Sequence, residues 1–189
     1  MKLIALNGKK QSGKDTIFNM SRDIFRYPDT TRVGRVAFAD AIKHEVSDIT
    51  GFRADFIEEH KEKFRSLLQV WGSDFRRQFS GDDYWINKMD AILEASKEHY
   101  DVMFITDCRF KNEAAFIKAK GGHVIRVERR VESYDTLQDL PDLDSHISEN
   151  DMNDYSDFDY VINNDKTHKE LEQAIKDMLV TLKLIENAT

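Results

Sequence analysis

The segment LNGKKQSGKDT, residues 6–16, constrains the fold more than any other feature of this chain. Residues 8–14 match the pattern GxxxxGK, and they lie between an apolar run that predicts a strand and a stretch that predicts a helix. This order is typical of a phosphate-binding loop, because glycines let backbone N–H groups turn toward one point and the helix N-terminus adds partial positive charge. Lys14 would reach the β- and γ-phosphates of a nucleotide. A merely solvated lysine is disfavoured there, since a helix N-terminus does not stabilise a cation.

The residue after the loop lysine departs from the usual pattern. A Ser or Thr that ligates magnesium normally follows this lysine, whereas here Asp15 follows it and a hydroxyl appears only at Thr16. Asp15 could hold the metal through water or could cap the helix start, and the sequence leaves both alternatives open. Asp15 and Thr16 are therefore the candidate magnesium ligands.

Strand and helix patterns alternate along most of the chain. The predicted strands are residues 2–6, 33–39, 102–106, 123–127 and 160–162. Helices are predicted at 14–26, at 111–120 and from Thr167 onward, where Thr167 and Glu170 form a capping box ahead of the inward-facing Leu171, Ile175, Met178 and Leu182. This alternation predicts an α/β fold with a doubly wound parallel sheet covered by helices on both faces.

Two segments do not follow the alternation. Residues 39–99 look wholly helical, and an apolar face is predicted from the spacing of Phe64, Leu67, Leu68, Trp71 and Phe75. Residues 129–157 are polar and acidic without a period, and a loop of that length is usually functional or disordered. We expect one domain, residues 1–189, with a core at about 1–38, 100–128 and 158–189, a helical insert at about 39–99 and a lid at about 129–157.

Composition excludes several classes of protein. The chain is 40% hydrophobic and 33% charged, as in globular proteins, and no apolar run approaches the roughly 20 residues of a membrane span. The N-terminus lacks a secretory pattern, and the single Cys108 excludes a disulfide framework and a cysteine-rich zinc site. We therefore expect a cytoplasmic protein that binds no membrane. The net charge of −7 argues against binding to a nucleic-acid backbone.

Charged residues gather at two predicted strand ends in the second half of the chain. Asp107 ends the strand in VMFITDCRFKNEA, where a Walker B acid would stand, and Arg109 follows two residues later. Ligands of doubly wound sheets bind at the carboxyl ends of strands, so both side chains should face the phosphate loop; the alternative for Asp107 is an ordinary strand-end cap. HVIRVERR then places Arg126, Arg129 and Arg130 where the polar loop begins, which suits a lid that neutralises transferring phosphate, although any one of them could be a surface residue.

These residues resemble the deoxynucleoside monophosphate kinases of tailed bacteriophages, within the larger nucleoside monophosphate kinase group. The matching pieces are LNGKKQSGKDT, FADAIK, LLQVWGSDFRRQFSGDDYWINKM, ITDCRFKNEAAFIKAKGGHVIRVER and DSHISENDMNDYSDFDYVINND. The resemblance implies a P-loop core, a helical monophosphate-binding insert and a lid. The element at 146–149 is also similar to phosphomevalonate kinases of animals, so another phosphorylated acceptor stays an alternative.

The resemblance also implies roles for individual residues. The residues expected to bind ATP are Gly8, Lys10, Ser12, Gly13, Lys14, Asp15, Thr16, Arg126 and Arg130. Those expected to line the acceptor site are Asp40, Lys43, Arg77, Trp85, Asp107 and Arg109. We expect Lys14, Arg109 and Arg129 to act in catalysis. Two points stay open: Arg76 or Arg77 could face the acceptor phosphate, and Trp85 could contact a base or pack in the core.

The sequence thus predicts phosphoryl transfer from ATP, with Mg²⁺, to a deoxynucleoside monophosphate. The acceptor phosphate is already a nucleophile, so catalysis would depend on alignment and charge neutralisation and would need no Ser/His/Asp set. A regulatory nucleotide-binding module is the rival from another class; such switch proteins typically have a Ser or Thr where Asp15 stands. The accepted bases, the exclusion of ribonucleotides and the number of subunits, with a homodimer among the alternatives, stay open.

Overall fold

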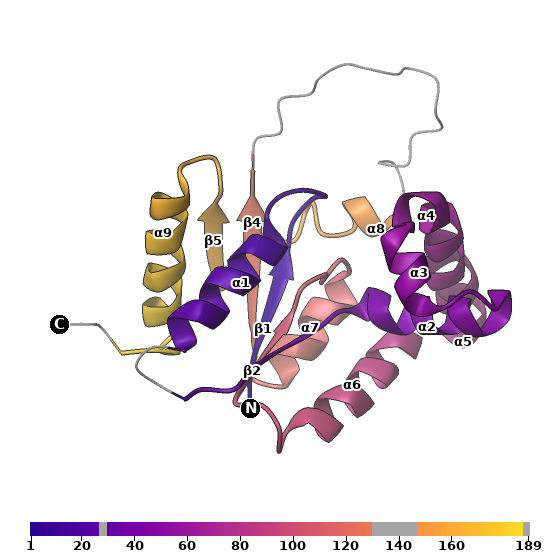
Figure 1. Cartoon of the computed structure of the whole chain (residues 1–189), viewed down its shortest axis with the longest axis horizontal. Coiled ribbons are helices and arrows are strands. Elements are labelled where there is room, and N and C mark those ends of the chain that lie inside the picture. Colours follow the sequence, from indigo (N-terminus) through magenta and orange to yellow (C-terminus); the bar gives the residue numbers. More distant parts are fainter. Residues whose placement is uncertain (27–29, 130–146, 187–189) are drawn as a thin grey trace.

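A computed structural model describes residues 1–26, 30–129 and 147–186 (Figure 1). Five parallel strands form one sheet in the order β2-β3-β1-β4-β5. The strands are β1 (Lys2–Asn7), β2 (Val33–Val36), β3 (Val102–Ile105), β4 (His123–Glu128) and β5 (Tyr160–Asn163). The predicted parallel sheet is confirmed, and all carboxyl ends lie at one edge.

Helices cover both faces of the sheet, and the side chains of β1 show why. Ile4 and Leu6 pack on one face against α1 (Lys14–Phe25) and α9 (His168–Thr181). Leu3 and Ala5 pack on the other face against α6 (Tyr84–Ser96) and α7 (Lys111–Ala119). A central parallel strand that is buried on both sides reads as a continuous apolar run, which is why it could be predicted.

The expected capping box starts α9. The Thr167 hydroxyl accepts a hydrogen bond from the Glu170 N–H at 3.4 Å, and the Glu170 carboxylate accepts one from the Thr167 N–H at 3.1 Å. Leu171, Ile175 and Met178 are buried as predicted, whereas Leu182 caps the C-terminus and is half-buried.

The segment expected to be a helical insert is helical in the structure, and one strand boundary differs from the prediction. It consists of α2 (Phe38–Thr50), α3 (Ala54–Glu59), α4 (Lys61–Gln69), the π-helix η1 (Val70–Arg77), α5 (Gln78–Ser80) and α6. The strand predicted at 33–39 ends at Val36, and Phe38 and Ala39 begin α2. The reason is a tertiary cap: the Asp107 carboxylate accepts hydrogen bonds from the Phe38 and Ala39 N–H groups at 2.7 and 2.8 Å.

The apolar face predicted for residues 64–75 is only partly buried. No residue of α4 is buried, and Leu67 and Phe75 are exposed. The change from α- to π-helix at Val70 shifts the phase of the later side chains, so the predicted spacing does not keep them on one face.

Most of the predicted lid, residues 130–146, lies outside the described residues. Beyond it, α8 (Ile147–Asn150) leads into a segment that packs on the core, since Met152 is buried and Asp151 accepts a hydrogen bond from the Lys111 N–H at 2.8 Å. Within the described ranges, no helix is long and apolar enough to cross a membrane.

Candidate active site

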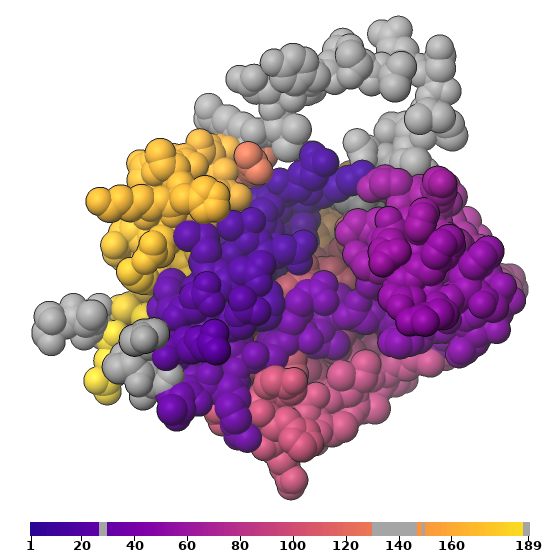
Figure 2. Space-filling model, in the orientation of Figure 1, coloured from indigo at the N-terminus to yellow at the C-terminus, as the bar shows by residue number. Residues whose placement is uncertain are grey.

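A cavity of about 320 Å³ lies between the phosphate loop and the insert, at the carboxyl edge of the sheet. Figure 2 shows the surface hollowed between the indigo N-terminal residues and the magenta helices of the insert. Its basic lining residues are Lys10, Lys14, Arg35, Lys43, Lys61, Arg65, Arg77 and Arg109. Its acidic lining residues are Asp15, Glu58, Glu62, Asp107 and Glu113. An excess of cations in a chain of net charge −7 suits an anionic ligand.

The loop behind β1 has the geometry of a phosphate cradle. The Lys14 ammonium donates hydrogen bonds to the carbonyls of Gly8 and Lys9 at 2.7 and 2.8 Å, so it lies over the loop. Gly13 has φ of 98°, and a Cβ there would clash with the Asn164 amide, which donates to the Ser12 carbonyl at 2.8 Å. The structure therefore requires glycine at this position.

Three further residues of the predicted ATP site belong to this loop or directly follow it. Lys10 lines the cavity and forms an ion pair with Glu62 of α4 at 2.9 Å. Asp15 is exposed in the first turn of α1 and also lines the cavity, and Thr16 follows it half-buried.

The arginines predicted near the lid have different surroundings. The Arg126 guanidinium donates to the Asn7 side chain at 2.8 Å, and Asn7 in turn donates to the Cys108 carbonyl at 2.8 Å. Arg129 reaches the phosphate loop, where it donates to the Gln11 carbonyl at 3.5 Å. Arg130, like His146, lies outside the described residues. Asn7 thus orients Arg126, a role that nothing local in the sequence indicates.

Asp107 and Arg109 follow β3 as predicted and both line the cavity. Both carboxylate oxygens of Asp107 accept the N–H donors of α2 described above, so the geometry matches the strand-end cap. Burial raises the pKa of Asp107 above its ordinary value, against the opposing effect of these donors. Arg109 also lines a small pocket beside Gly8, Lys9 and Arg126.

The structure separates the two consecutive arginines of η1. Arg77 lines the cavity, and its guanidinium lies 3.6 Å from the centroid of the Phe110 ring and donates to Glu113 at 2.6 Å. Arg76 instead donates to Glu45 at 2.7 Å, inside the insert. Of the two, Arg77 is therefore the one that faces the cavity.

The remaining predicted acceptor residues are only partly at the cavity. Trp85 lines it but is 2% exposed, and its indole N–H donates to the Gly72 carbonyl at 2.7 Å, so most of the ring packs in the core. Lys43 also lines the cavity, and its ammonium pairs with the carboxylates of Asp40 and Glu58 at 2.7 and 2.9 Å. Burial lowers the pKa of Lys43, but these two carboxylates outweigh burial and raise the pKa above its ordinary value. Asp40 is not a lining residue: it binds Lys43 and the Ala37 N–H.

Several polar residues of the cavity wall belong to no motif singled out in the sequence. They are Arg35, Lys61, Arg65, Gln69 and Ser73. Lys61, Arg65 and Gln69 recur every four residues, which places them on one helix face, and this spacing could have found them.

A parallel sheet, a phosphate loop behind its central strand and a cationic cavity define the P-loop class of phosphate-binding proteins. The fold is similar to that of dephospho-CoA kinase from Campylobacter jejuni (TM-score 0.54, 15% identity, covering 98% of this chain and 100% of that chain). It is also similar to shikimate kinase from Acinetobacter baumannii in complex with shikimate (TM-score 0.51, 17% identity, covering 98% of this chain and 96% of that chain).

Within this class the family is defined more narrowly. The model of the deoxynucleotide monophosphate kinase family matches residues 36–175, and the chain belongs to this family of phosphotransferases. A protein of Acanthamoeba polyphaga mimivirus, provisionally named a deoxynucleotide monophosphate kinase, is 30% identical over 203 residues, covering 93% of this chain and 94% of the relative. The resemblance to deoxynucleoside monophosphate kinases is confirmed at the level of the family.

Proposed function

We propose that this protein transfers the γ-phosphoryl group of ATP to a deoxynucleoside 5′-monophosphate, giving a deoxynucleoside diphosphate and ADP. The observation that carries the proposal is that one cavity is lined both by the phosphate loop, with Lys14, and by the insert, with Arg77. The triphosphate of ATP and the monophosphate of the acceptor are both anionic and must meet within one cavity. Cations that bind each of them there are therefore needed.

The phosphate loop and its neighbours would bind ATP. Lys14 and the glycine-rich backbone suit the β- and γ-phosphates, while Arg109, Arg126 and Arg129 lie close to the loop and suit the transferring group. The acceptor phosphate would take the space between Arg77 and Arg109. Neutralising and aligning these anions would accelerate transfer without a general base.

The residues present fit a magnesium ion held together with ATP. Mg²⁺ is usually bound by one or two protein oxygens plus substrate phosphates, and the exposed Asp15 and the adjacent Thr16 suit that arrangement. The part of the chain that is described contains no group of three or more His, Cys, Asp or Glu side chains that could hold a metal ion. When bound, the ion would neutralise charge on the β- and γ-phosphates.

A coupled assay of ADP release tests the proposal. ATP with Mg²⁺ is incubated with each of the four common deoxynucleoside monophosphates, with phosphomevalonate, and without any acceptor. We expect ADP release that depends on at least one deoxynucleotide and is absent with phosphomevalonate. Release driven only by phosphomevalonate would favour the other acceptor class, and no acceptor-dependent release would favour a non-catalytic nucleotide-binding module.

A further inference from the structure

Asn112 and Glu113, in the first turn of α7, attach the C-terminal part of the insert to the core. Glu113 accepts a hydrogen bond from Arg77 Nη2 at 2.6 Å, and the Asn112 side-chain oxygen accepts one from Arg77 Nη1 at 3.2 Å. The Asn112 amide also donates to the Asp82 carbonyl at 3.0 Å. Neither residue has a role in the function proposed above, although both belong to the segment ITDCRFKNEA.

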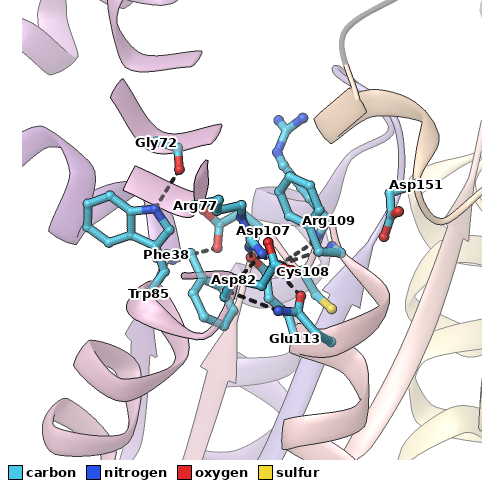
Figure 3. Close-up of polar contacts among 12 residues, drawn as sticks. Phe38, Gly72, Arg77, Asp82, Trp85, Asp107, Cys108, Arg109, Glu113 and Asp151 are labelled. Carbon is cyan, nitrogen blue, oxygen red and sulfur yellow. Dashed lines mark hydrogen bonds and ion pairs between the residues drawn. The ribbon is translucent and has the colours of Figure 1, made fainter. Parts of the chain in front are cut away.

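The second oxygen of Glu113 binds the core. It accepts hydrogen bonds from the backbone N–H groups of Arg109 and Phe110 at 2.8 and 3.2 Å. Figure 3 shows Glu113 beside Arg77 and the main chain of Arg109, whose side chain points away from the carboxylate. One carboxylate therefore links the Arg77 guanidinium directly to the main chain that carries Arg109.

This link is almost entirely removed from water. The Glu113 side chain is 3% exposed and the Arg77 side chain 9% exposed. A buried ion pair contributes little net stability, because desolvation offsets the Coulomb attraction. Its short charge-assisted hydrogen bonds do fix geometry, since the planar guanidinium fork has few orientations that satisfy them.

We propose that Glu113, with Asn112, is a positioning residue for the acceptor phosphate: it sets the separation between Arg77 on the insert and Arg109 on the core. The inference rests on the proposed function only in taking these two arginines as the acceptor-phosphate ligands. ATP would bind mainly through Lys14 and the phosphate loop, and Arg109 would meet only its transferring γ-phosphoryl group. Removing the carboxylate should therefore weaken acceptor binding and alignment and leave ATP binding nearly unchanged.

Steady-state kinetics of Glu113→Gln and Asn112→Ala, with each substrate varied in turn, test this inference. Glu113→Gln keeps the shape and one acceptor oxygen but loses the charge, so we expect acceptor kcat/KM to fall about tenfold or more, the scale of a lost charge-assisted hydrogen bond. The KM for ATP should change less than about twofold. Asn112→Ala removes weaker contacts and should act in the same direction to a smaller extent.

Glu45→Gln is the matched control. Glu45 is also buried and also pairs with an arginine of η1, Arg76, but it lies wholly inside the insert. We expect Glu45→Gln to lower thermal stability without a change specific to the acceptor. If it reproduces the acceptor-specific loss, or if Glu113→Gln raises both KM values equally, the positioning role is wrong.

Two other outcomes are also decisive. If Glu113→Gln does not fold, Asn112→Ala decides the question, because Asn112 is only half-buried and its loss leaves no unpaired buried charge. Full wild-type activity together with unchanged acceptor kinetics in the variants would overturn the positioning role alone. A wild-type protein that phosphorylates no deoxynucleotide would instead overturn the proposed function.

Discussion

Arg76 and Arg77 are adjacent in the chain but contact different buried glutamates. Arg76 pairs with Glu45 of α2, and Arg77 pairs with Glu113 of α7. Arg77 is thus neither solvated nor on a polar helix face, so its substitution should alter the cavity and not merely the surface. The glutamate that each arginine contacts therefore decides whether its guanidinium lies at the cavity or inside the insert.

Lys14→Ala should abolish phosphoryl transfer and leave the fold intact. Its ammonium lies over the loop and contributes to no apolar core, so its loss should lower the rate by about 10³-fold or more. Single-turnover ADP formation measures the rate, and thermal unfolding checks the fold. Lys63→Ala, an exposed lysine away from the cavity lining, is the control. Near-normal turnover of Lys14→Ala would remove the phosphate-loop assignment.

Glu113 should make stability depend on pH near neutrality. Burial raises the pKa of Glu113 to about 7, against the opposing effects of Arg77 and the N–H groups of Arg109 and Phe110, while nearby Asp107 raises it further. Cys108, whose own pKa burial raises, lies close to the same carboxylate. Because the folded protein binds the Glu113 proton more tightly than the unfolded chain does, this proton stabilises the fold. The stabilisation is present in full below the ordinary pKa of about 4.5 and is lost as pH rises through 7.

Urea unfolding of the wild type and Glu113→Gln at pH 5 and pH 8 measures this effect. The glutamine cannot ionise, so the stability advantage of the wild type over the variant should be smaller at pH 8 than at pH 5. A difference that stays constant, or that grows with pH, would contradict the raised pKa.

At the scale of elements, Glu45 joins three helices of the insert. Its carboxylate accepts hydrogen bonds from Trp71 and Arg76 of η1 at 2.9 and 2.7 Å and from Tyr84 of α6, and it forms an ion pair with Lys88 of α6 at 2.7 Å. Burial alone would raise its pKa, but these partners lower the pKa of Glu45 to about 2. The insert is therefore organised around one buried anion.

Glu45→Gln should destabilise the protein in a pH-dependent way. Because the pKa of Glu45 is lower in the folded protein than in the unfolded chain, its ionised carboxylate stabilises the fold. This stabilisation is present above about pH 4.5 and is lost as pH falls through 2. The full stabilisation is about 3 kcal/mol. Chemical unfolding at pH 6 and pH 3 should give a smaller difference between wild type and variant at pH 3. An equal difference at pH 6 and pH 3 would contradict this explanation.

At the scale of the whole molecule, Lys10 and Glu62 join the phosphate loop to the insert. Their ion pair is exposed, so it is worth at most about 1 kcal/mol. If Lys10 binds ATP, the nucleotide competes with Glu62 for it. Glu62→Gln should then tighten ATP binding by up to about fivefold. Nucleotide titration measures this, with the exposed Glu59→Gln as control, and weaker binding would argue against competition.

Local signals explain which parts of the fold and site could be predicted. Strands such as β1 are continuous apolar runs, α9 has a capping box, and the phosphate loop has a motif in its strand-helix setting. Contacts between distant residues carry no such signal. Asp107 caps a helix that begins 69 residues earlier, and Glu113 binds an arginine 36 residues earlier. For the same reason the sequence alone does not distinguish Arg76 from Arg77, whereas the π-helix directs them to different glutamates.

The chain contains two tryptophans, and both belong to the insert: Trp71 in η1 and Trp85 in α6. Trp85 packs in the core against one face of the sheet, whereas the other large buried aromatic side chains, such as Phe104, are phenylalanines. Intrinsic fluorescence excited at the indole band therefore reports on the insert and, through Trp85, on its packing against the sheet. Without any attached dye, emission during substrate titration would follow the surroundings of the insert and of its contact with the sheet.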